Sequence, residues 1–449
     1  MTTTTTTTSP TTTNGAARPP RIPRGRRCFQ APRFLPVLAV LAVFHLAVGI
    51  GCDVTLHVGR NGETGAGGDG TNLGPDGGAT GGASGATGGT FVPPVRTPPD
   101  RHAPLTSTSK LDLLFMIDDS ASMAPLQAKM RVKIPQFMDV LKNLPGGMPD
   151  LHLAVVSSSI GAGKFSNVAQ CEPGTQGNGD GLFKHSSACT QLNPGETFLK
   201  SSIDASGARV ENFKGGDITP VFDCLASLGD QGCGFEHQFE SVRLALQRSL
   251  TVSNPPDPNA GFLRSDAYLA IVMLTNEDDC SVPYDSDLFD PSMQTLADPL
   301  GGLQSYRCNE FGHKCDQPLP HGAAGLPMTL TGCESKEDGR LVTVNGFIDF
   351  LFSLKPMHPE RIFVAAIAGP TTPYTITSHL FMLGNGDTES QPAIQHSCTS
   401  GMQGSEYADP AVRVQQWTQA FGPNSYFGNI CSDDLGLTMS SIAERMVGP

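Results

Sequence analysis

The side chains with the clearest chemical potential are three oxygen donors that follow one apolar run. Residues 111–123 read LDLLFMIDDSASM, so that Asp118, Ser120 and Ser122 come directly after the apolar residues. One carboxylate and two hydroxyls on a tight loop are hard ligands, which suit Mg²⁺, Mn²⁺ or Ca²⁺ and not zinc. They leave the shell of such a cation open to water, another loop or a partner's carboxylate. The same residues would also serve as a helix cap and a turn without any metal.

The elements around these residues predict a sheet that positions them. The apolar run is continuous, as in a parallel strand that is buried on both faces, and helical spacing follows from Ala124 up to Pro145. Similar patterns predict strands at 151–158, 267–274, 361–368 and 424–431, and helices at 235–250, 341–354, 412–421 and 433–447. We therefore expect an α/β fold, a doubly wound, mostly parallel Rossmann-like sheet with helices on both faces. Ligands of such sheets bind beyond the carboxyl ends of the strands.

The D-x-S-x-S spacing after the first strand resembles the von Willebrand factor A (vWA) domain and its metal-ion-dependent adhesion site. The resemblance covers residues 110–449 and implies the vWA fold, a divalent cation (Mg, Mn or Ca), and Asp118, Ser120 and Ser122 as ligands from the first loop. In the third loop the family commonly has Thr-Asp-Gly, and this chain has Thr275, Asn276 and Glu277. Asn276 is then the implied ligand, through its amide oxygen.

The second metal loop departs further from the family pattern. The family supplies a threonine before the next helix, where this chain reads GCGFE, so Glu236 is the nearest oxygen ligand. Glu236 would also be favourable at a helix N-terminus without any metal. Thr219, in GGDITP, is a second candidate, and Asp278 could alter the charge of the site. GCGFE and NEDDCS together resemble a group of cysteine-rich bacterial lipoproteins that carry A-like domains.

The first 109 residues predict export and a tether. Residues 1–33 are Thr-rich and basic and are expected to be disordered, and the apolar run 34–51 is typical of a signal peptide. Cys52 follows small residues, which resembles the lipobox of bacterial lipoproteins and implies lipidation, although Gly49 departs from the usual leucine. Ordinary secretion and an uncleaved anchor remain alternatives. Residues 52–109 are rich in Gly and Pro and predict a flexible tether.

Three long insertions are expected within the domain, at about 161–232, 281–340 and 369–410, with little hydrophobic periodicity. An even number of cysteines in an exported chain predicts disulfides that pin such insertions. For the first four cysteines we expect nearest neighbours to pair. Asn178 and Asp180 superficially resemble a calcium loop. The segment lacks the ordered acidic positions and the terminal Glu of an EF-hand, which favours a plain turn. The ten candidate cysteines are Cys171, Cys189, Cys224, Cys233, Cys280, Cys308, Cys315, Cys333, Cys398 and Cys431.

These features favour a binding module over an enzyme. The formal net charge is −13, and residues 1–51 hold six arginines and no acid, so a processed chain would be more acidic and would not suit nucleic acid. We expect a membrane-tethered envelope protein, on the outer membrane or cell surface, that binds a protein partner offering a carboxylate. A structural envelope lipoprotein with a degenerate metal site is the alternative. A hydrolytic enzyme is disfavoured, because G-x-S-x-G and H-E-x-x-H motifs are absent from the sequence.

Overall fold

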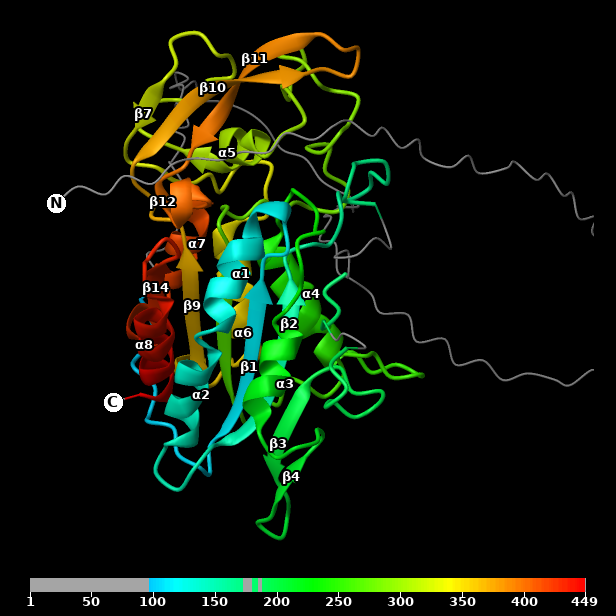
Figure 1. Ribbon diagram of the computed structural model, residues 1–449, viewed down its shortest axis with the longest axis vertical. Helices are drawn as coiled ribbons and strands as arrows, with labels where there is room; N and C mark the ends of the chain where they lie inside the picture. Colours follow the sequence, from blue (N-terminus) through cyan, green and yellow to red (C-terminus); the bar gives the residue numbers. More distant parts are fainter. Residues whose placement is uncertain (1–96, 173–179, 185–187, 449) are drawn as a thin grey trace, which may run out of the picture. The chain divides into compact units, whose positions relative to one another are not determined.

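The computed structural model describes residues 97–172, 180–184 and 188–448 (Figure 1). The expected N-region, signal peptide and Cys52, most of the tether and Asn178 lie outside the described residues. Asp180 lies in a turn. Within the described part of the chain, no helix has both the length and the apolar character that a membrane span requires.

A seven-stranded sheet forms the centre of the domain, in the order β14-β9-β5-β1-β2-β3-β4. Five strands are parallel, and β3 and β4 add an antiparallel edge. The mixed α/β architecture with a mostly parallel sheet is thereby confirmed. The strands are β1 (Lys110–Ile117), β2 (Asp150–Ser157), β3 (Leu199–Ile203), β4 (Arg209–Glu211), β5 (Tyr268–Leu274), β9 (Ile362–Ala368) and β14 (Ser425–Asn429).

Helices cover both faces of this sheet, because its central strands are buried on both sides. In β1, Leu113 and Phe115 belong to one apolar core, and Leu114 and Met116 belong to the other. The first core is covered by α1 (Ala124–Arg131), α2 (Ile134–Lys142), α3 (Ile218–Leu225) and α8 (Leu435–Val447). The second is covered by α4 (Gln238–Leu250), α6 (Val344–Leu354) and α7 (Val412–Gln419). Short 3₁₀ turns occupy η1 (Ala121–Met123), η2 (Pro359–Arg361), η3 (Met402–Gly404) and η4 (Gly422–Asn424).

The expected single helix after the first loop is two helices. It breaks at Val132 and Lys133, between α1 and α2. Pro135 lies in the first turn of α2, where its missing N–H is tolerated, whereas in mid-helix its ring would clash with the preceding turn. The apolar periodicity continues across the break, which is why the sequence pattern alone did not reveal it.

The insertions contain more structure than their sequence predicted. The first supplies β3, β4 and α3, and the second buries Leu288, Phe289 and Leu300 in a small core that it shares with Ala162 and Val168 of the first. A strand of the second insertion joins two strands of the third in the sheet β11-β10-β7, beyond the carboxyl ends of the parallel strands (Figure 1). The remaining elements are α5 (Tyr306–Gly312), β6 (His313–Lys314), β7 (Met328–Leu330), β8 (Glu334–Ser335), β10 (Tyr374–Met382), β11 (Thr388–Gln395), β12 (Cys398–Ser400) and β13 (Glu406–Ala408).

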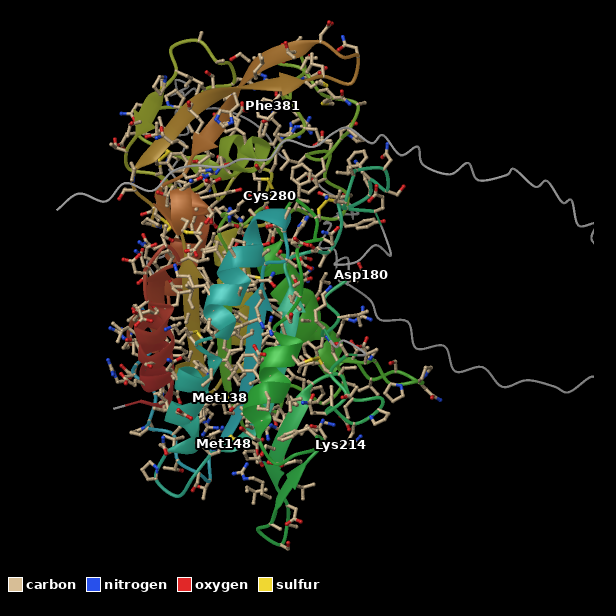
Figure 2. All side chains as sticks on the ribbon, viewed as in Figure 1. Met138, Met148, Asp180, Lys214, Cys280 and Phe381 are labelled. Atoms are coloured by element: carbon tan, nitrogen blue, oxygen red, sulfur yellow. A yellow bond between two sulfur atoms is a disulfide. The ribbon has the colours of Figure 1, made fainter. Side chains whose placement is uncertain are left out.

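All ten candidate cysteines form disulfides, which confirms the prediction of five bridges. The bridges are Cys171–Cys233, Cys189–Cys224, Cys280–Cys308, Cys315–Cys333 and Cys398–Cys431. Nearest-neighbour pairing of the first four was wrong, because they form one bridge nested inside another. The backbone N–H of Cys233 donates to Ser159 beside the end of β2, and this places Cys233 next to Cys171. Five disulfides indicate an oxidising, exported environment. Figure 2 shows Cys280 between the parallel strands and the upper sheet that carries Phe381.

Candidate functional site

Asp118 is the point at which three loops of the sheet meet. It follows β1, it is fully buried, and its backbone N–H donates to the carbonyl of Leu274 at 2.9 Å. Its Oδ1 accepts from the backbone N–H of Ser120 at 2.9 Å and from the Ser158 hydroxyl at 3.2 Å, and its Oδ2 accepts from the Thr275 hydroxyl at 2.8 Å. Burial raises the pKa of Asp118, and these hydrogen bonds oppose the rise.

The two loop serines and Asn276 lie beside one another at this edge. Ser120 Oγ is 3.3 Å from Ser122 Oγ, which is 3.2 Å from Asn276 Oδ1. Neighbouring ligand oxygens around an octahedral cation with bonds of about 2.1 Å are about 3.0 Å apart. The spacing of these neutral oxygens therefore fits a hard divalent cation after small adjustments. The structure brings together Asp118, Ser120, Ser122 and Asn276, and we call these four residues the hydroxyl site.

Glu236 lies in a neighbouring cavity and makes no described hydrogen bond to either serine. Its side chain is 1% exposed, and its Oε1 has no hydrogen-bond partner among the described residues. Burial, then the charges of Glu277 and Asp118, raise the pKa of Glu236 well above its usual range. The pKa of Glu277 rises to about 8, through burial and the nearby charges of Asp409 and Asp118. Glu236 thus belongs to an acidic group with Glu277 and Asp409.

The other sequence candidates lie elsewhere. The Thr219 hydroxyl accepts from Lys142, the last residue of α2, and Asp217 caps α3 by accepting from the Thr219 N–H. Asp278 is paired with His313 at 2.9 Å and accepts from the backbone N–H of Arg413, so it is not free to bind a ligand. His358, His379 and His396 have separate neighbours, Glu360, Phe381 and Asp409 respectively, and form no common site among the described residues.

A hairpin of the third insertion covers the hydroxyl site, and sequence analysis missed it. Asn276 Nδ2 donates to the Tyr407 carbonyl at 3.2 Å, and the Tyr407 side chain hydrogen-bonds with Ser122. The hairpin, β12 and β13, is held to α1 by an ion pair of 2.7 Å between Lys129 and Glu406. No spacing in the sequence relates Tyr407 to Ser122. Ser158 and Thr275 were also missed as partners of Asp118, although hydroxyls at the ends of neighbouring strands were a usable signal.

No protein-family model and no curated protein matches this chain.

The donor set decides which cations the hydroxyl site fits. In the described part of the chain, no group of three or more His, Cys, Asp or Glu side chains is arranged to hold a metal ion. The hydroxyl site is of a different composition, since it offers one carboxylate, two hydroxyls and an amide. Such neutral oxygens suit Mg²⁺, Mn²⁺ or Ca²⁺ and leave most of the cation's charge available to an incoming anion.

Proposed function

We propose that this chain is an exported, vWA-like binding module that recognises a protein partner through a divalent cation at the hydroxyl site. The observation that carries the proposal is the meeting of Asp118, Ser120, Ser122 and Asn276 beyond the carboxyl ends of β1 and β5. Ligand sites of parallel sheets lie at this edge. The five disulfides support export, and Cys52 is the proposed lipid anchor to the outer membrane or cell surface.

Each residue has a distinct task in this proposal. Ser120 and Ser122 present hydroxyl oxygens, and Asn276 presents an amide oxygen. Asp118 supplies negative charge, and its hydrogen bonds hold the three loops together. A bound Mg²⁺, Mn²⁺ or Ca²⁺ supplies the positive charge that attracts a partner's Asp or Glu. With a single carboxylate in the set, affinity for the cation alone should be weak and should rise when the partner's carboxylate joins.

A structural role in the envelope is the second candidate, and one observation favours it. Tyr407 already occupies hydrogen-bonding positions on Ser122 and Asn276, so the β12–β13 hairpin covers the surface that a partner would need. If the hairpin stays closed, the hydroxyl site is an internal polar cluster that joins the third insertion to the sheet.

Calorimetric titration with Mg²⁺ and Mn²⁺ tests the proposal. Wild type should bind weakly, and the double variant Ser120→Ala, Ser122→Ala should bind at least about tenfold more weakly, because two ligand oxygens are lost. Ser253→Ala, at an exposed serine, is the control and should match wild type. Equal binding by the double variant and wild type, or no binding by either, would leave the structural role as the better account.

A further inference from the structure

A small cavity lined by acids lies next to the hydroxyl site. Glu236, Glu277 and Asp409 line it, together with Ser305, Asn309 and the Cys280–Cys308 bridge, and we call it the acid chamber. Its volume, counted as the space open to the centre of a water molecule, is about 10 Å³. That is room for about one water molecule. Cys280, labelled in Figure 2, marks its wall between the parallel sheet and the upper insertions.

Two further acids of the chamber wall already have protein hydrogen-bond donors on both of their oxygens. Asp279 is paired with Arg413 at 2.9 Å, and both side chains are 0% exposed. Asp278 accepts from the backbone N–H groups of Arg413 and Val414 and is paired with His313. These groups are structural, because each of their oxygens has a protein donor.

The other three carboxylates lack such compensation. No described Lys or Arg forms an ion pair with Glu236, Glu277 or Asp409, and Asp409 is paired only with the half-exposed His396 at 2.7 Å. Glu236 is buried, lines the chamber, and leaves its Oε1 without a partner. A buried carboxylate oxygen without a donor is costly unless a cation or a proton compensates it.

We infer that the acid chamber is a calcium site, separate from the hydroxyl site, in which Glu236, Glu277 and Asp409 are the carboxylate ligands. Glu236 and Glu277 share a side-chain hydrogen bond, so one of the two carries a proton when no cation is bound, and Asp409 is not gathered with them into a preformed cluster. A cation would displace that proton and draw the three side chains inward.

The chamber favours Ca²⁺ over Mg²⁺ for reasons of size and hydration. Mg²⁺ dehydrates reluctantly and usually keeps several of its waters, for which a space of one water-sized particle is too small. Ca²⁺ accepts irregular sets of six to eight oxygens, and carboxylates can bind it through both oxygens. The hydroxyl site differs, because it has one carboxylate and opens toward the hairpin.

A calcium ion here would join three segments that are distant in the sequence. Glu236 precedes α4, Glu277 follows β5, and Asp409 follows β13 in the third insertion. The backbone N–H of Asp409 already donates to the Asn276 carbonyl at 2.8 Å. Calcium would therefore fix the insertions to the carboxyl edge of the sheet, whether or not the hydroxyl site binds a partner.

Equilibrium dialysis of the purified full chain with radioactive Ca²⁺, after treatment with a chelator, tests the inference. Wild type should bind one Ca²⁺ more tightly than any other. Glu236→Gln and Glu277→Gln should each weaken that binding at least tenfold, and Ca²⁺ should raise the unfolding temperature of wild type but not of these variants. Without Ca²⁺ the variants should be at least as stable as wild type, because a repelling charge has been removed, and this shows that they fold.

Two controls separate this inference from the proposed function. Glu360→Gln changes a carboxylate in η2, just before β9 and at the opposite edge of the sheet, and should bind Ca²⁺ as wild type does. The Ser120→Ala, Ser122→Ala variant should keep the tight Ca²⁺. Loss of tight Ca²⁺ in the serine variant with retention in both glutamate variants would overturn the inference and leave the proposed function standing. Absence of tight Ca²⁺ from wild type would overturn it as well, because protons would then neutralise the chamber.

Discussion

Arg413 and Asp279 form an ion pair that is closed to solvent, and its energetics differ from those of a surface pair. Arg413 Nη2 lies 2.9 Å from Asp279 Oδ2, Nη1 donates to the Ser335 hydroxyl at 2.8 Å, and the pair joins α7 to the loop after β5. Removal of one partner from a buried pair leaves a charge without compensation, which costs about 3–5 kcal/mol.

We therefore predict that Arg413→Met lowers the free energy of unfolding by about 3–5 kcal/mol. Urea denaturation followed by circular dichroism measures it. Lys314→Met is the matched control, because Lys314 and Glu334 are 70% and 61% exposed, and its effect should stay below about 1 kcal/mol. Similar losses in the two variants would contradict the assignment of Arg413 as a buried structural cation.

His152 gives a prediction about pH. Burial, then the charge of Arg264, lower its pKa from 6.5 to about 4. Between these values the unfolded chain binds the proton and the folded chain does not, so the contribution of His152 to stability falls as the pH falls from 6.5 toward 4. In His152→Phe this contribution is absent, and the new ring would pack beside Phe198 and Phe262.

The free energies of unfolding of wild type and His152→Phe should therefore converge, or cross in favour of the variant, as the pH falls through this window. The difference should change by at most about 1.4 kcal/mol per pH unit. Urea denaturation at pH 7, 6, 5 and 4 measures it, and a comparison of the two proteins cancels the titration of other groups. A difference that is constant across the window would show that His152 titrates normally.

At the residue scale, sequence predicted the donors that lie on one loop and missed the partners that come from distant segments. Asp118, Ser120 and Ser122 were found because one strand end carries all three. Glu236 was identified as a candidate ligand, but the acid chamber that it shares with Asp409 was not, because no sequence pattern shows that the third insertion folds back over this edge of the sheet. Tyr407 was missed for the same reason.

The β12–β13 hairpin is the element that covers the hydroxyl site. Its ion pair between Lys129 and Glu406 has side chains that are 15% and 16% exposed, and the Cys398–Cys431 bridge ties β12 to the segment just after β14. The bridge fixes only β12, and β13, which carries Tyr407, is held by the ion pair together with the hydrogen bonds of Tyr407 to Ser122 and Asn276.

We predict that Lys129→Met loosens the hairpin without unfolding the domain. Amide hydrogen exchange at residues 398–408 should accelerate about fivefold, which corresponds to about 1 kcal/mol of lost closure energy. Mass spectrometry after timed exchange measures it. Lys110→Met is the control, because Lys110 pairs with the exposed Asp266 at the amino edge of the sheet and should leave the hairpin unchanged. Unchanged exchange in Lys129→Met would mean that other contacts hold the hairpin.

At the element scale, the predicted parallel strands and sheet-covering helices are present because buried runs and apolar periodicity encode them directly. The insertions were less predictable, since their small cores depend on disulfide pairing and on contacts between segments far apart in the chain. β7 illustrates this, because it pairs with β10, which lies more than forty residues later. Local pattern contains no information about such a pairing.

At the scale of the whole molecule, the proposed export and lipid anchoring predict the N-terminus and the cysteine bonding of the processed protein. The chain from membranes should begin at Cys52 with lipid attached, and the ten later cysteines should be unreactive toward thiol reagents under denaturing conditions without reductant. Mass spectrometry of the N-terminal peptide and thiol counting measure these two features. A peptide that extends upstream of Cys52 would contradict anchoring, and two or more free thiols would contradict the bridging.

The position of β1 has a mechanical consequence. His102 and Leu105 are buried against the domain ahead of β1, and the chain then runs from Lys110 along β1 to the hydroxyl site at the end of that strand, between β2 and β5. A pull between an N-terminal anchor and a partner held at the hydroxyl site would load the contacts of His102 and Leu105 first and then β1 along its own axis. Its hydrogen bonds to both neighbours would then be sheared together and could not open one at a time, so the strand that carries the site would also be the part of the domain best able to bear tension.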